Sequence, residues 1–214
     1  VLGRVNVKEY RVVHTDLKTI VKYKSSNETL QWIFDAYVRT QNSNIHGCIP
    51  SDCPHRERLG YTGDGQLCGE TAMMLLDSRE FYRKWLYDIA DCQCRKTGHV
   101  QHTAPLMGGG GGPSGWGGAI IEVPYKFYKM YGAKELLNEF FPKMLHFLDY
   151  LESRSENGLV CREEKDGWCL GDWCTPDPIV VPETYINTVL YVRFIQQVIE
   201  SAQILGREDR KENI

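Results

Sequence analysis

The sequence predicts a mainly α-helical fold of stacked helical hairpins, preceded by a short β segment. Six segments carry apolar residues at helical spacing. Short turns alternate between them with long loops that are rich in glycine, aromatic and acidic residues. At 214 residues, with 42% hydrophobic and 25% charged residues, the chain is long enough to bury a substantial core. We expect the function to lie on the side of the long loops.

The N-terminal segment is expected to form strands followed by a helix. Residues 4–24 are β-branched and partly alternating, which predicts one or two strands. The pattern from Ser25 to Glu28 resembles a capping box. A helix over about 28–44 is predicted by apolar residues spaced along one helical face, namely Leu30, Ile33, Phe34, Tyr37 and Val38.

Two further helices are predicted after a charged loop. The first carries Leu67, Met74 and Leu75, and Ser78 is expected to cap the second. The apolar face of that second helix contains Phe81, Tyr82, Trp85, Leu86 and Ile89. The short junction between the two helices implies an antiparallel pair. Residues 95–117 are loop-like and include five consecutive glycines at 108–112.

The remaining chain is expected to hold three helices. The fourth helix ends at Gly132, and Pro142 is predicted to open the fifth at its first position, with an end near Arg154. The sixth covers 182–206. No sequence repeat is detected, and the charged tail that follows begins like another helix.

Composition argues against several classes of function. The net charge is −3, the pI is about 6.1 and no basic cluster occurs, so nucleic acid is not an expected partner. No apolar run approaches the roughly 18 residues that a membrane span requires. The eight cysteines include no Cys-x-x-Cys pair, and the histidines have no i, i+4 spacing, so no metal is expected.

The segment from Asp52 to Asp64, DCPHRERLGYTGD, concentrates ionisable residues in a loop. Glycoside hydrolysis needs a protonated carboxyl group for the leaving oxygen and a second carboxylate that activates water or attacks the sugar. Glu57, beside Arg56, is suited to such chemistry. The alternative is that Asp64 caps the following helix and that the Arg-Glu-Arg run is a solvated charge cluster.

Three tryptophans lie in similar loops, namely Trp116, Trp168 and Trp173. Aromatic faces stack on the apolar faces of sugars, and a neighbouring carboxylate such as Asp172 accepts hydrogen bonds from hydroxyls. The alternative for each tryptophan is an ordinary place in the core. Because all three are in loops, they favour a carbohydrate site.

These motifs resemble those of the bacterial alpha-L-rhamnosidases. Residues 52–64 match the signature of that family, residues 115–119 (GWGGA) resemble its Gly-Trp-Gly-Asp-Ala element, and residues 170–173 (LGDW) resemble its Gly-Asp-Trp element. The resemblance covers roughly residues 25–210. Two positions depart from the pattern, because Tyr61 stands where Trp is usual and Gly118 where Asp is usual.

The resemblance implies an (α/α)6 barrel, with an inner and an outer ring of six helices, preceded by β-sandwich domains. Residues 1–24 would then be the end of a preceding β-sandwich domain or linker strands, and 25–214 the N-terminal half of the barrel. Half a barrel leaves apolar faces without partners, which favours self-association of the isolated chain.

The resemblance also implies a reaction, the removal of terminal alpha-L-rhamnose from an oligosaccharide or glycoside with inversion and without a cofactor. Glu57 would be the general acid. The implied substrate-binding residues are Asp52, Arg56, Tyr61, Asp64, Trp116, Asp172 and Trp173. The general base would be a glutamate beyond Ile214, so the isolated chain is expected to be inactive.

Three other functions remain open. The chain could belong to another (α/α)6 glycosidase with a different sugar specificity, which substrate profiling would reveal. It could be a non-catalytic carbohydrate-binding protein, consistent with Gly118 and the absent base. A helical interaction scaffold is disfavoured, because it does not require the charged loop. The sequence does not specify the linkage, the aglycone or the cellular compartment.

Overall fold

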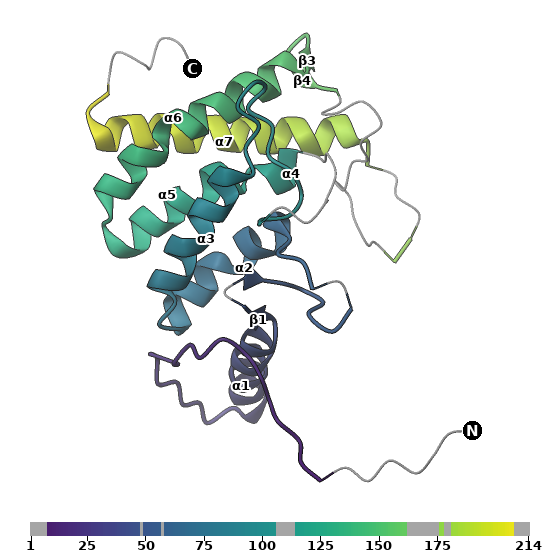
Figure 1. The fold of residues 1–214 in the computed structure, drawn as a ribbon, viewed down its shortest axis with the longest axis vertical. Helices are drawn as coiled ribbons and strands as arrows, with labels where there is room; N and C mark the ends of the chain where they lie inside the picture. The colour runs from purple at the N-terminus through teal and green to yellow at the C-terminus, as the bar shows by residue number, and fades with distance from the viewer. Residues whose placement is uncertain are drawn as a thin grey trace.

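The computed structural model describes residues 8–47, 49–56, 58–105, 114–161, 176–177 and 181–207. Most of these residues are helical (Figure 1). The helices are α1 (Glu28–Ser43), α2 (Thr62–Leu75), α3 (Arg79–Asp91), α4 (Ser114–Gly117), α5 (Ala119–Tyr131), α6 (Lys134–Ser153) and α7 (Glu183–Leu205). The predicted mainly α-helical fold is therefore confirmed.

Two small antiparallel hairpins supplement the helices. Strand β1 (Ile45–His46) pairs with β2 (Ile49–Pro50), and β3 (Ser155–Glu156) pairs with β4 (Leu159–Val160). The first hairpin follows α1 directly and leads into the charged loop. The second follows α6 and contacts α7, so it fixes the end of one helix against another.

Helix α5 is the centre of the core. It packs against α2, α3, α6 and α7, which surround it in Figure 1. The largest fully buried side chains are aromatic, among them Trp85, Tyr82, Phe127 and Phe140. Each such side chain contributes on the order of 1.5–3 kcal/mol through burial. The hairpin stack is therefore stabilised mainly around α5.

The predicted alternation of short and long connections is present. Residues 76–78 join α2 to α3 and residues 132–133 join α5 to α6, whereas long connections follow α3 and α6. Gly132 and Gly206 end α5 and α7 in the left-handed conformation, at φ values of 66° and 71°. These two helix ends were predicted from the same glycines.

The predicted start of the fifth helix is wrong. Helix α6 begins at Lys134, and Pro142 lies inside it. The physical reason is burial: Leu136, Leu137 and Phe140 lie before the proline and are packed in the core. Their burial outweighs the backbone hydrogen bond that Pro142 cannot donate.

The predicted N-terminal strands are also wrong over the described residues 8–24. This segment is extended and contains no strand. It contacts the helical core through the Leu17 side chain, an isolated bridge between Thr19 and Leu76, and backbone bonds such as Thr15 N to Ile45 O at 2.9 Å. A β-branched pattern forms a strand only where a partner strand is aligned with it.

The N-cap of α1 also differs from the prediction. The Asn27 side chain, rather than Ser25, accepts hydrogen bonds from Thr29 N and Leu30 N.

The apolar face predicted for α1 exists but is largely uncovered within the described chain. Leu30 is 49% exposed and Ile33 is 50% exposed, while Phe34 stacks on Tyr23 with ring centroids 4.9 Å apart. Figure 1 shows α1 apart from the helices around α5.

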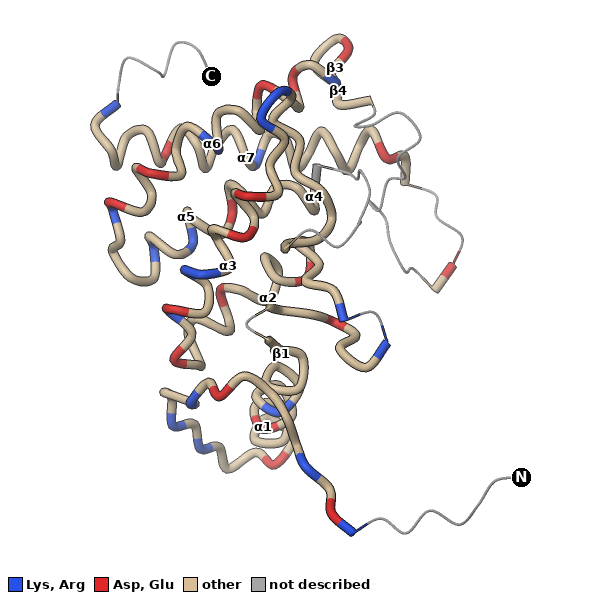
Figure 2. Tube along the Cα trace, viewed as in Figure 1, with Lys and Arg blue, Asp and Glu red and all other residues tan. Residues whose placement is uncertain are grey.

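Charged residues of both signs are interspersed along the described chain (Figure 2). No described helix combines the length and the hydropathy that a membrane crossing requires.

Candidate active site

The charged loop is held by short local contacts. Arg56 N and Arg58 N both donate to Cys53 O, at 3.1 and 3.3 Å, and Arg58 adopts a left-handed φ of 59°. Cys53 Sγ donates to Asp52 Oδ2 at 3.3 Å. Asp52, Arg56 and Arg58 are exposed. Their charged groups are therefore presented at the surface. Glu57, the predicted general acid, lies outside the described residues.

The start of α2 is anchored to a segment far away in sequence. Thr62 N donates to His102 O at 2.7 Å, and Thr62 Oγ1 donates to the same oxygen at 2.9 Å. Ala104 N donates to Gly60 O at 2.9 Å, and Tyr61 pairs with Thr103 in an antiparallel bridge. These bonds fix where the charged loop ends and where the first turn of α2 points.

Asp64 lies in the first turn of α2 and is half-buried. The N-cap residue is Tyr61, so the alternative that Asp64 caps a helix after it is wrong. A carboxylate in the first turn is stabilised by the helix dipole. Its charge reaches Cys68: burial raises the pKa of the Cys68 thiol, Asp64 raises it further, and Lys126 opposes the shift. Asp64 thus lies close enough to Cys68 to influence the pKa of its thiol.

Trp116 lies on α4, directly over the first turn of α2. A side chain at position 63 would overlap its indole ring, so Gly63 permits this close approach. The ring of His102 packs edge-on against the indole, with centroids 6.2 Å apart. Burial, and to a lesser degree the charge of His99, lower the pKa of His102 to about 4. His102 is therefore a neutral ring that supports the tryptophan.

A cavity of about 530 Å³ lies between α2, α4, α5 and α7. Asp64 and Trp116 line it on one side, and the apolar side chains of Ile186 and Leu190 on α7 line the other. This volume lies within the range of about 300–1,000 Å³ typical of small-molecule sites. An apolar wall opposite a carboxylate and an indole suits a neutral ring that carries hydroxyl groups.

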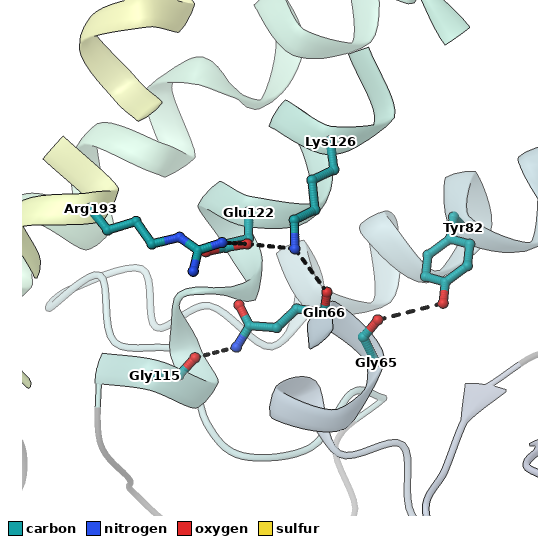
Figure 3. Close-up of polar contacts among 7 residues, drawn as sticks. All are labelled: Gly65, Gln66, Tyr82, Gly115, Glu122, Lys126 and Arg193. Carbon is teal, nitrogen blue, oxygen red and sulfur yellow. Dashed lines mark hydrogen bonds and ion pairs between the residues drawn. The ribbon is translucent and has the colours of Figure 1, made fainter. Parts of the chain in front are cut away.

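An ion-pair network around the buried Glu122 lies at the cavity wall (Figure 3). Glu122 is only 4% exposed, and its carboxylate lies 2.8 Å from Lys126 Nζ. The same carboxylate accepts hydrogen bonds from Arg193 Nε at 2.7 Å and from Arg193 Nη2 at 3.1 Å. Lys126 Nζ also donates to Gln66 O at 3.2 Å, and Gln66 Nε2 donates to Gly115 O. The network joins α2, α4, α5 and α7, so it fixes the shape of the cavity.

Gly118 lies between α4 and α5, where Phe194 of α7 covers it. A side chain at position 118 would overlap the Phe194 ring, which also lines the cavity. The aspartate that the family pattern has at this position therefore has no room in this packing, and the wall there is apolar.

The structure brings together two of the predicted site residues, Asp64 and Trp116, on one cavity. Asp52, Arg56 and Tyr61 are described but are not among the residues that line it. Glu57, Asp172 and Trp173 lie outside the described residues, so their roles stay predictions. Within the described ranges, no group of three or more His, Cys, Asp and Glu side chains could hold a metal ion.

Sequence reasoning missed three residues of the cavity wall, Gln66, Glu122 and Arg193. Glu122 had a usable signal, because a single carboxylate in the apolar run of α5 indicates a buried, paired charge. Gln66 and Arg193 had none, since a polar residue on a helix gives no sign of which distant groups it meets.

Comparison with known proteins shows similarity along almost the whole chain. A family model described as the bacterial alpha-L-rhamnosidase 6 hairpin glycosidase domain matches residues 18–213. An alpha-L-rhamnosidase from Streptomyces avermitilis is 32% identical over 200 residues, which are 92% of this chain and 19% of that protein. One from Formosa agariphila is 30% identical over 203 residues, 84% of this chain and 21% of that protein.

Solved structures agree with these matches. The Streptomyces avermitilis alpha-L-rhamnosidase complexed with L-rhamnose superposes with a TM-score of 0.82 at 31% identity, covering 92% of this chain and 18% of that one. The alpha-L-rhamnosidase from Dictyoglumus thermophilum gives a TM-score of 0.84 at 29% identity, covering 94% and 23%. The chain spans about a fifth of the length of the curated relatives it matches.

Proposed function

This chain belongs to the family of bacterial alpha-L-rhamnosidase 6 hairpin glycosidase domains, and on that premise we propose that it forms part of the active site of an inverting alpha-L-rhamnosidase. The substrate would be a terminal alpha-L-rhamnose of an oligosaccharide or glycoside. No cofactor is needed, because the reaction is an acid–base assisted displacement at a sugar carbon.

The observation that carries the proposal is the meeting of Asp64 and Trp116 on one cavity. They come from two motifs that are far apart in the sequence, the charged loop and the Gly-Trp-Gly element. The apolar α7 wall opposite them completes a setting in which a sugar ring can be enclosed.

Glu57 is proposed to act as the general acid. Its protonated carboxyl group donates the proton to the glycosidic oxygen as the bond from that oxygen to the anomeric carbon breaks. Asp52 and Asp64 would accept hydrogen bonds from the rhamnose hydroxyls, with Arg56 beside them. Trp116 and Trp173 would form walls of the sugar pocket, and Tyr61 would offer a further stacking face. Asp172 would accept hydrogen bonds from sugar hydroxyls.

A second carboxylate must remove a proton from the attacking water on the opposite face of the ring. In an inverting enzyme the two carboxyl groups stand about 6.5–9.5 Å apart to admit that water. The family resemblance assigns this base to a glutamate on a later segment. We therefore propose that turnover requires the complete gene product, and that the 214-residue chain alone is inactive.

The role of Glu57 is tested by varying the leaving group. In the complete gene product, Glu57→Gln should lower kcat/KM about 100- to 10,000-fold on a rhamnosyl disaccharide, whose alkoxide must be protonated to leave. The loss should be much smaller on 2,4-dinitrophenyl alpha-L-rhamnoside, because that phenolate departs without a proton. Equal losses on both substrates would contradict the role of general acid.

Substrate profiling and product analysis test the alternatives. Nuclear magnetic resonance should show the β-anomer of L-rhamnose as the first product, as inversion requires. Preferential hydrolysis of another terminal sugar would favour a different (α/α)6 glycosidase. Binding of sugar by the complete gene product without any hydrolysis would favour a carbohydrate-binding protein.

A further inference from the structure

We propose that Gln66 is a substrate-binding residue whose Oε1 atom accepts a hydrogen bond from a sugar hydroxyl in the cavity. The inference rests on the proposed function, and it adds a contact that the motifs did not indicate. Gln66 lies on α2 two residues after Asp64, lines the same cavity and is only 6% exposed.

The orientation of the Gln66 amide follows from its neighbour. Gly115 O can only accept a hydrogen bond, so the amide group that meets it must be the NH₂ group. Figure 3 shows the Gln66 nitrogen directed at Gly115 and its oxygen on the opposite side, toward Glu122 and Arg193. The oxygen is thereby fixed in place by packing and by one hydrogen bond.

That oxygen has no hydrogen-bond partner within the described chain, although it is buried. An unsatisfied buried acceptor costs about 1–3 kcal/mol, so native structures usually provide a donor from protein, water or ligand. The two cations of the cavity wall are directed elsewhere. Lys126 donates to Glu122 and to the Gln66 backbone oxygen, and Arg193 donates to Glu122.

A second unsatisfied group on the same cavity is a donor. Trp116 Nε1 is buried without a hydrogen-bond partner among the described residues. A hydroxyl group both donates and accepts, so a ligand with hydroxyls can satisfy the Gln66 oxygen and the Trp116 nitrogen together. A carboxylate has no proton for Gln66, and an ammonium has no lone pair for Trp116. The pair therefore favours a neutral, polyhydroxylated ligand such as a sugar.

The test combines a variant with deoxy substrates in the complete gene product. Gln66→Met keeps the approximate length and volume but removes the acceptor, together with the donor to Gly115 O, and it should lower kcat/KM for 4-nitrophenyl alpha-L-rhamnoside by about 10- to 100-fold. The wild type should lose a similar factor on one of the three monodeoxy rhamnosides. On that analogue Gln66→Met should cause almost no further loss, because the hydroxyl it served is already absent.

Gln197→Met is the matched control. Gln197 on α7 is 9% exposed and also has an unpartnered buried Oε1, but it does not line the cavity. Its replacement should leave kcat/KM within about twofold. Equal losses for the two variants, or a Gln66→Met loss that is the same factor on every analogue, would overturn the inference.

Two further measurements distinguish a loss of the Gln66 contact from misfolding of the variant and from failure of the proposed function. Gln66→Glu in its protonated form can donate to Gly115 and still present a carbonyl oxygen, so it should retain more activity than Gln66→Met. Calorimetric binding of L-rhamnose should weaken in Gln66→Met and not in Gln197→Met. An inactive wild type that still shows this difference would refute the proposed hydrolysis alone, whereas an active wild type without it would refute the role of Gln66 alone.

Discussion

The first part of the charged loop, residues 52–56 and 58, and the cavity wall around Glu122 place the same kinds of charged residue in opposite surroundings. In the loop, Asp52 and Arg56 are exposed, and the Cys53 thiol contacts both side chains. In the wall, Glu122 is buried and binds Lys126 and Arg193 across two helices. We propose that the loop presents charge to a ligand, whereas the charges of the wall hold the cavity in shape.

This difference predicts that the wall governs stability and that the loop governs catalysis. Exposed ion pairs contribute little to stability, because water screens them. A buried carboxylate that loses its charge leaves its cations desolvated and unpaired. The four predictions below test this division, from the largest expected effect on stability to the smallest.

The largest effect is expected from the buried carboxylate. Glu122→Gln should lower the free energy of unfolding by about 3 kcal/mol, because Lys126 stays largely buried without its counter-charge. Urea unfolding measures this change. The control is Glu200→Gln, which removes an exposed carboxylate 2.9 Å from Lys129 and should cost no more than about 1 kcal/mol. Equal costs for the two variants would contradict a structural role for the wall charge.

The next effect concerns the close approach of α7 to the cavity. Gly118→Ala should lower the free energy of unfolding by about 1–3 kcal/mol, because its methyl group would overlap the Phe194 ring. Gly69→Ala is the control, since a β-carbon there meets Tyr82 at an ordinary 3.4 Å, and it should be neutral or stabilising by up to about 1 kcal/mol. Thermal unfolding of both variants measures these changes. A Gly118→Ala variant as stable as the wild type would mean that α7 is not packed against position 118.

Stability should also depend on pH through His102, whose ring packs against Trp116. Its pKa is lowered from 6.5 to about 4 in the folded state, so between these values the unfolded chain binds a proton that the folded chain does not. Stability should therefore fall as the pH decreases from about 6.5 to about 4. Urea midpoints should fall less steeply for His102→Gln over this range, and an unchanged slope would argue that the ring is not buried behind Trp116.

The smallest effect on stability is expected in the loop. Asp52→Asn should change the free energy of unfolding by less than about 0.5 kcal/mol, because the carboxylate is exposed. In the complete gene product it should lower kcat/KM by about tenfold or more, through a lost hydrogen bond to the sugar. A variant that is destabilised yet fully active would reverse the assignment of the two regions.

The parts of the fold that the sequence predicts well depend on local chemistry. Gly132 and Gly206 end helices because glycine adopts the left-handed conformation readily, and Pro182 precedes the first turn of α7. Predictions from local chemistry fail where packing between segments distant in sequence determines the secondary structure. Pro142 is inside α6 because core residues on both sides hold the helix. Residues 8–24 find no partner strand among the described residues, although their pattern requires one.

The same distinction applies to the site. Asp64 and Trp116 can be named as candidates from the sequence because they occur in dense, recognisable motifs. Gln66 and Arg193 cannot, because their significance arises only where α2 and α7 approach each other. Local rules read from a sequence do not specify which residue of one helix faces which residue of another.

The most direct test is a crystal structure of the complete gene product with L-rhamnose. The sugar should occupy the cavity between α2 and α7, with a hydroxyl within hydrogen-bond distance of Asp64 and a ring face or edge against Trp116. Glu57 should lie on the side of the anomeric oxygen. Rhamnose bound at another place, with this cavity filled by protein side chains, would contradict the account.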